Sequence, residues 1–340
     1  MNVAQQVPDH EFSQALKAIE EENISVEEKV EMLLHIANGL QVKPKSPQQL
    51  QNAVTLLNKA YELCPATEVL IAARIQARRG TALQIIPSST SEYLQKARDE
   101  FEAALPVLNQ LGNNEETAEA EMNLGLTIQT LASINAGLIT DAISAYQRSL
   151  KIFTQEKYPK EYAILHNNLA TAYLSIPITD EKAKMREALA VQSFEEALKV
   201  VTLVDQPSEY AMLQNNLGNA LQYVSSSHAV ENNLRALDAY DEALKVRTVK
   251  DTPLEYANTI CNKANCLRNL PDDIESPETG NMKHLQLARD LYLQAQSIFN
   301  QFGDSSKAVV IEDMLTEVNQ DLLGSTTQPK NENGFGESRI

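Results

Sequence analysis

One pattern of side chains recurs six times along the chain: a small residue, three of any kind, a bulky residue, two of any kind, and a second small residue. The copies are Ala53/Leu57/Ala60, Ala97/Phe101/Ala104, Ala142/Tyr146/Ser149, Ala190/Phe194/Ala197, Ala236/Tyr240/Ala243 and Ala288/Tyr292/Ala295. Spacings of four and three put these positions on one helical face, where small residues let a neighbouring helix approach closely. The pattern predicts six helices, each packing one bulky side chain against a partner helix.

A second recurring segment supplies that partner helix. Its copies are PKEYAILHNNLATAY from Pro159, PSEYAMLQNNLGNAL from Pro207, PLEYANTICNKANCL from Pro253 and, more weakly, NEETAEAEMNLGLTI from Asn114. Proline followed two residues later by glutamate is typical of a helix start, and Thr252 with Glu255 predicts a capping box. One position of the segment is always small, because a larger side chain there would push the partner helix away: Gly125, Ala170, Gly218 and Ala264. Two helices per repeat follow.

These segments resemble the tetratricopeptide family, whose first helix carries Leu-Gly and whose second carries Ala-x3-Phe-x2-Ala. The resemblance spans roughly residues 47–300, although the period is longer than the ~34 residues of the standard repeat and the closing proline is missing. Stretches such as ENNLRALDAYDEALKVRT are most similar to long bacterial arrays often joined to caspase-like peptidase domains, and NNLA and NNLG are similar to kinesin light chain repeats. The resemblance implies an all-α, right-handed solenoid of about six helix pairs with long second helices.

The ends of the chain differ from the repeats. We expect one solenoid domain over residues 11–323, clearest over 97–300, between disordered segments at 1–10 and 324–340, which are too polar to bury a core. Residues 11–42 are expected to cover the first pair with Met32, Leu33, Ile36 and Leu40. A closing helix over 305–323 is predicted to cap the array, with its inward side chains at Val310, Met314, Val318 and Leu322.

Charge and hydropathy exclude several classes of partner. The chain has 29 Lys and Arg against 46 Asp and Glu, a formal net charge of -17, which repels nucleic acid and acidic membranes. Neither a leader peptide nor a run of about 18 apolar residues occurs, so we expect a cytoplasmic protein without membrane insertion. Low glycine and proline contents, 11 and 13 residues, favour long helices.

The sequence offers no set of residues for catalysis, a cofactor or a metal. The five histidines are scattered, no glycine-rich phosphate loop occurs, and Cys64, Cys261 and Cys266 form no CxxC pair. The cysteines are interpreted as small buried hydrophobic residues. We therefore expect a protein that is not an enzyme and that binds other proteins or peptides.

Polar residues on the first helices are the candidate binding site, because the family binds ligands on the side that these helices line. The ten candidates are Asn167, Thr171, Asn215, Asn219, Gln222, Tyr223, Asn258, Asn265, Arg268 and Asn269. Amides donate and accept, so a row of them can hold the backbone of an extended peptide. If this interpretation is correct, replacing Asn215, Asn219 and Asn265 by alanine should hardly change stability. The neighbouring Asn168, Asn216 and Asn262 are interpreted as structural, and the basic cluster Arg74, Arg78 and Arg79 as an exposed face or a dock for a carboxylate-rich partner.

Three hypotheses for the function stay open at this point. The leading one is a scaffold or adaptor that binds a peptide or a partner helix in the concave groove. The second is an assembly chaperone or stabilising subunit of a large complex, acting through its convex face or the loops around Thr179 and Asp272. The third is a regulatory receptor that closes on a peptide or small molecule.

Overall fold

The computed structural model describes residues 10–18, 24–42, 44–176, 183–224 and 228–327, and all regular elements in these ranges are helices. The first helices of the pairs are α2 (Val26–Val42), α4 (Val69–Gln84), α6 (Asn114–Ser133), α8 (Pro159–Ser175), α10 (Pro207–Tyr223) and α12 (Pro253–Arg268). The second helices are α3 (Pro47–Leu63), α5 (Glu92–Leu111), α7 (Ile139–Ser149), α9 (Ala183–Leu198), α11 (Ala229–Leu244) and α13 (Met282–Gln301). Helix α1 (His10–Ala18) precedes them and α14 (Ser305–Thr327) follows; a 3-10 turn, η1 (Pro277–Thr279), precedes α13. The predicted all-α repeat class is confirmed.

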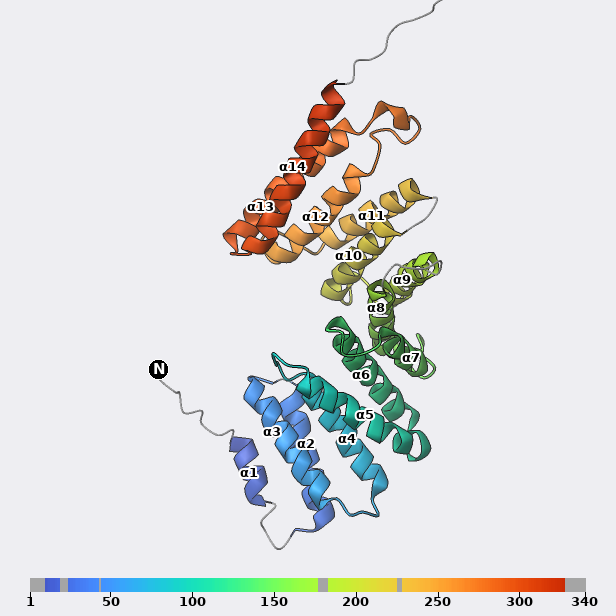
Figure 1. Cartoon of the computed structure of the whole chain (residues 1–340). Coiled ribbons are helices and arrows are strands. Elements are labelled where there is room, and N and C mark those ends of the chain that lie inside the picture. The colour runs from blue at the N-terminus through green and yellow to red at the C-terminus, as the bar shows by residue number, and fades with distance from the viewer. Residues whose placement is uncertain (1–9, 19–23, 43, 177–182, 225–227, 328–340) are drawn as a thin grey trace, which may run out of the picture. The chain divides into compact units, whose positions relative to one another are not determined.

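The helices form two compact units, Met1–Pro177 and Ile178–Ile340, so that α1 to α8 lie in the first unit and α9 to α14 in the second. Within each unit, every helix packs mainly on its neighbours in the chain, as Figure 1 shows for α4 beside α5 and for α12 beside α13. The expected single domain over 11–323 stays a prediction. Nearly all of the segment 1–10, most of 324–340, and Thr179 lie outside the described residues.

The repeat register is confirmed by burial, because all six bulky positions of the pattern are inaccessible to solvent. Leu57, Phe101, Tyr146, Phe194, Tyr240 and Tyr292 are each at most 1% exposed. The motif covers only part of most second helices: α5 and α13 reach 20 residues, and only α7, with 11, is short. Burying an aromatic side chain in this way contributes ~2–3 kcal/mol. The six copies are therefore the main apolar anchors of the array.

The predicted small position of the first helix is where the ring of the second helix lies. A Cβ atom added to Gly125 would lie 2.6 Å from the Tyr146 ring, and one added to Gly218 would lie 2.6 Å from the Tyr240 ring. Real side chains do not approach so closely, so these glycines are required by the helix contact itself. Gly80 of α4 makes the same contact with Phe101, at 2.9 Å, which the sequence comparison had not included.

The predicted capping box at Thr252 and Glu255 is wrong. Thr252 makes no side-chain cap to α12, because its hydroxyl already accepts a hydrogen bond from the backbone N–H of Thr248 at 3.1 Å. A complete capping box occurs instead at the start of α6. There the Asn113 side chain accepts from the Glu116 backbone N–H at 2.7 Å, and the Glu116 carboxylate accepts from the Asn113 backbone N–H.

The two end helices bury nearly the faces that the sequence predicts. In α2, Leu33 and Leu40 are buried, while Met32 and Ile36 are half-buried. In α14, Val318 is buried but Val310 is 52% exposed, so the inward assignment of Val310 is wrong. The buried face comprises Ala308, Ile311, Leu315 and Val318. This face starts two residues earlier, at Ala308, which packs in the α13 cluster, and the helix continues past residue 323, through Thr327.

The glycine contacts predict opposite effects for the same substitution at two sites. Gly218→Ala should lower the free energy of unfolding by ~1–3 kcal/mol, because the new methyl overpacks the Tyr240 ring. Gly39→Ala in α2, where nothing lies within 4 Å of the new Cβ, should raise it by ~0.5–1 kcal/mol through helix propensity. Thermal unfolding followed by circular dichroism measures both. Equal shifts of the two midpoints would show that the glycines do not set the helix spacing.

Candidate functional site

First helices of successive repeats are joined by polar contacts within each unit. In the first unit, Arg74 of α4 forms an ion pair with Glu116 of α6 at 2.8 Å between Nε and Oε1. Further along, the Gln129 amide of α6 donates to the Thr171 hydroxyl of α8 at 2.9 Å. In the second unit, the Asn262 amide of α12 donates to Asn215 Oδ1 of α10 at 3.2 Å. The first helices therefore form a polar face on which side chains reach from one repeat to the next.

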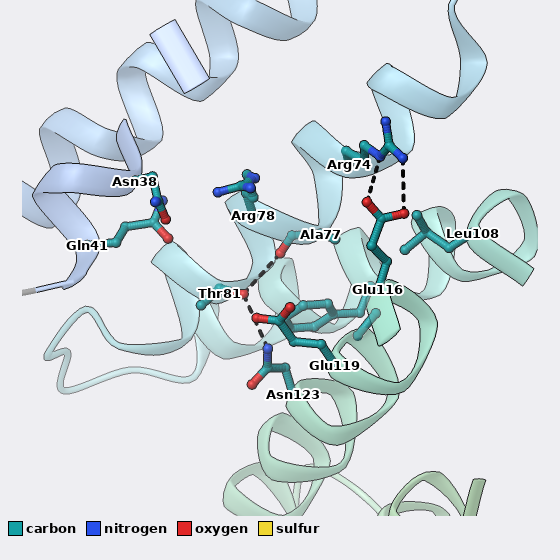
Figure 2. A pocket seen from close by; sticks show the side chains of 12 residues that line it. Asn38, Gln41, Arg74, Ala77, Arg78, Thr81, Leu108, Glu116, Glu119 and Asn123 are labelled. Carbon is teal, nitrogen blue, oxygen red and sulfur yellow. Dashed lines mark hydrogen bonds and ion pairs between the residues drawn. The ribbon is translucent and has the colours of Figure 1, made fainter. Parts of the chain in front are cut away.

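On this face the first unit has a groove of about 280 Å³ between α2, α4 and α6, which we call the α4 groove. Its apolar lining includes Phe101 and Leu108 of α5, both buried. The polar side chains that line it are Asn38 and Gln41 of α2, Arg74, Arg78 and Thr81 of α4, and Glu116, Glu119 and Asn123 of α6. Figure 2 shows these side chains around the opening, with Asn123 bonded to Thr81 and Arg74 to Glu116.

The polar groups of the α4 groove differ in whether the protein itself satisfies them. The guanidinium of Arg74 is neutralised by Glu116, and that of Arg79 by Glu100 at 2.7 Å. Arg78 is exposed and, in the described ranges, has no carboxylate within ion-pair distance. On α2, the Nε2 of Gln41 is buried without an acceptor among the described residues. The groove therefore contains donors that a ligand can satisfy.

Most predicted binding residues of the second unit are engaged inside the protein. The hydroxyl of Tyr240 donates to Asn219 Oδ1 at 2.8 Å and lies 3.0 Å from Gln222 Oε1. In the next repeat, the Tyr292 hydroxyl donates to Asn265 Oδ1. A buried hydroxyl without a partner is costly, so these amides stabilise the helix pairs. The side-chain oxygens of Asn219 and Asn265 are thus occupied, while their N–H2 groups bond to nothing in the described structure.

The other candidates vary in what they can offer. Arg268 forms ion pairs with Glu317 and Asp321 of α14, at 3.0 and 3.2 Å, and Asn269 donates to the Asn265 carbonyl oxygen. Tyr223 is 66% exposed, and Asn258 makes no hydrogen bond in the part of the chain described. Asn167 and Thr171 lie in the first unit, where the Oδ1 of Asn167 is buried without a partner among described groups. A continuous row through all ten residues stays a prediction.

Sequence reasoning missed the groove residues Asn38, Gln41, Thr81, Glu119 and Asn123. A signal for them was present in Gly80. Once Gly80 is aligned with Gly125 and Gly218, Arg78 falls at the position of Asn123, Asn216 and Asn262 on the first-helix face. The helix over 69–84 lacks the proline and glutamate start of the other copies, and so the alignment did not reach it.

Two of the three cysteines are largely shielded by their surroundings. Burial raises the pKa of Cys261 and of Cys266 to about 12, which keeps both thiols protonated near neutral pH. The Cys266 thiol donates to the Asn233 carbonyl oxygen at 3.0 Å. Among the residues that the structure describes, no group of three His, Cys, Asp or Glu side chains could hold a metal ion. None of the described helices combines the length and apolar character needed to cross a membrane.

Comparison with known proteins finds neither a matching family model nor a matching curated protein. Solved structures that match include YrrB, described as a TPR protein with an unusual peptide-binding site, at 20% identity and a TM-score of 0.41 over 69% of this chain and 92% of YrrB. A Rap protein complexed with competence and sporulation factor matches at 13% identity and 0.41, over 94% and 82% of the two chains. The TPR2AB domain of yeast Sti1, with an HSP90 peptide, matches at 16% and 0.29, over 85% and 98%. Tetratricopeptide proteins, which the repeated segments resemble, are thus among the solved structures similar to this chain.

The contacts of Asn265 change the expected effect of its removal. Asn265→Ala should cost ~1–3 kcal/mol of stability, because it leaves the buried Tyr292 hydroxyl without its acceptor. In a Tyr292→Phe background the same substitution should cost much less, which a double-mutant cycle by urea unfolding measures. Asn258→Ala, which removes no described bond, is the matched control and should stay within ~0.5 kcal/mol. If the two losses of stability are additive, Asn265 and Tyr292 do not interact, and the Asn265 amide is free to bind a ligand.

The buried tyrosines also predict a loss of stability at alkaline pH. Burial raises the pKa of Tyr292 to about 12, against a usual value of ~10 in an unfolded chain. Between these values the folded state binds more protons than the unfolded state, so stability falls as pH rises, by up to ~1.4 kcal/mol per pH unit for this residue. Below pH ~10 the phenol is neutral in both states and its contribution is constant. Urea midpoints measured from pH 9 to 11.5 should fall less steeply for Tyr292→Phe, and parallel slopes would contradict the assignment.

Proposed function

We propose that the protein is a non-enzymatic, cytoplasmic scaffold or adaptor that binds a peptide or a partner helix on its first-helix face, with the α4 groove as the main binding site. The observation that carries the proposal is a groove on the first-helix face whose polar side chains include groups without a partner among the described residues. Buried Phe101 and Leu108 are among the residues that line the groove, and Arg78 and Gln41 contribute donors to the lining. This combination of apolar lining and a few orienting polar groups is what a ligand site requires.

The first-helix face of the second unit gives a second, weaker contact surface in this proposal. The Nδ2 groups of Asn219 and Asn265 make no hydrogen bond in the described structure, and the exposed Tyr223 and the half-buried Asn258 lie on the same two helices. Donors spaced along a helix face suit backbone carbonyl groups of an extended segment. Asn167 and Thr171 belong to the proposed surface of the first unit.

The hypothesis of a partner bound by extended loops is less favoured, because the loop before α13 is tied down. The Asp272 carboxylate accepts hydrogen bonds from the backbone N–H groups of Lys283 and His284 at 2.8 and 2.9 Å. It therefore caps the start of α13, whose own N-cap residue Asn281 makes no side-chain cap. A group that caps a helix in this way is already satisfied. Assembly of a large complex and ligand-induced closure remain alternatives without a structural feature of their own.

A bulky substitution in the groove tests the proposal. The full chain is used to select binders from a displayed library of random peptides about 12 residues long, which in extended form exceed the width of three packed helices. Asn38→Trp, at an exposed groove position, should weaken binding of the selected peptides at least tenfold. Asn109→Trp, at an exposed position of α5 outside this groove, is the matched control and should leave binding unchanged. Loss of binding only with Asn109→Trp would place the site on the second helices and contradict the proposal.

A further inference from the structure

In a chain with a net charge of -17, most of the described arginines have an acidic partner. Arg74, Arg79, Arg98, Arg148, Arg235 and Arg268 each contact a glutamate. Arg78 has no such partner in the described ranges, although it lies one turn from Arg74 on the same helix. Arg247 also lacks an acidic partner in the described part of the chain, but it donates to the Thr259 hydroxyl at 2.8 Å. Arg78 therefore differs from these arginines in having neither an acid nor another acceptor among the described residues.

A second donor without a partner lies on the neighbouring wall of the groove. The Nε2 of Gln41, in the last turn of α2, is shielded from solvent and bonds to no acceptor among the described residues. Figure 2 shows Arg78 extending toward Asn38 and Gln41. A carboxylate accepts through two oxygens and can take hydrogen bonds from a guanidinium and an amide together, whereas another donor would leave both unsatisfied. Both groups call for an acceptor, and the positive charge of Arg78 favours a carboxylate over a neutral carbonyl oxygen.

The opposite wall has the reverse character. Glu119 of α6 is exposed, lines the same groove and has no cationic partner in the described part of the chain. Arg78 and Glu119 are on successive first helices and are not within ion-pair distance of each other. With packed helices ~8–10 Å apart and about 3.3 Å per residue of extended chain, the two charges match ligand side chains roughly two to four residues apart.

We infer that the α4 groove recognises a mixed-charge segment of a partner protein, with an internal Asp or Glu side chain bound by Arg78 and Gln41 and a Lys or Arg side chain bound by Glu119. The inference rests on the proposed function and names its ligand class. The acid is internal because Arg78 lies on the middle one of three first helices, so that the bound chain continues on both sides. A run of acids is disfavoured by the net charge of the protein.

The composition of the selected peptides tests this inference separately from binding itself. Peptides enriched by the full chain from the random library should carry an acid two to four residues from a base. Synthetic peptides with Asp or Glu changed to Asn or Gln should bind the wild-type protein at least fivefold more weakly than the acidic originals. The Arg78→Gln protein should bind the two versions equally well. Fluorescence anisotropy measures both. Arg98→Gln, which removes an arginine of α5 outside the groove, should behave as the wild type.

The wild type should select peptides with one order of acid and base from N- to C-terminus. The double variant Arg78→Glu with Glu119→Arg should select peptides with the opposite order. The inference is overturned if the enriched peptides contain no acid. It is also overturned if removing the acid weakens binding to Arg78→Gln as much as to the wild type. In both cases the proposed function stands. If no peptide is enriched by the wild type, both fail. Peptides that need only a free C-terminal carboxylate, lost on amidation, would also overturn the internal assignment.

Discussion

The structure depends on the contact between a ring of the second helix and a glycine or alanine of the first. Tyr146 lies on Gly125, and Tyr240 lies on Gly218, so closely that even a methyl group would not fit. Such a contact fixes both the distance between the helices and their register, because the ring packs closely only against a small residue, glycine in these two pairs and Ala264 in the cluster of Tyr292. The remaining apolar contacts of each pair then follow from the helical spacing of small and bulky residues.

The same contact decides where the polar side chains of the first helix are used. A tyrosine ring that crosses the first helix places its hydroxyl near the residues one and four positions beyond the small residue. In the Tyr240 pair these positions are Asn219 and Gln222, and in the Tyr146 pair the second of them is Gln129, whose Oε1 accepts the hydroxyl at 2.7 Å. The amides of Gln129, Asn219 and Gln222 therefore have a structural role as acceptors for tyrosine hydroxyl groups. Their presence on the first helices does not by itself require that they bind a peptide.

The fold could be predicted from the sequence because its determinants are local and repeated. Six copies of one spacing specify the buried positions, and the proline starts specify where α8, α10 and α12 begin. The candidate site could not be predicted as well, because whether a polar side chain is free depends on residues far away in the chain. Arg268 has the same appearance in sequence whether or not Glu317 is beside it. The capping error at Thr252 has a local cause instead: the backbone N–H of Thr248, four residues earlier, donates to the same hydroxyl.

Where the repeat has phenylalanine in place of tyrosine, the requirement on the first helix is removed. Phe101 packs on Gly80 like the other rings but has no hydroxyl that needs an acceptor. Arg79 of α4 is held within the pair by Glu100 of α5, but on the groove side the Thr81 hydroxyl donates to the Ala77 carbonyl oxygen of its own helix at 3.1 Å, and Arg78 has no partner in the described ranges. The α4 groove lies over this pair, with Phe101 in its lining. Leu57 and Phe194 likewise bring no hydroxyl, but of these repeats it is the Phe101 pair that lies beneath the α4 groove, where Arg78 is available to a ligand.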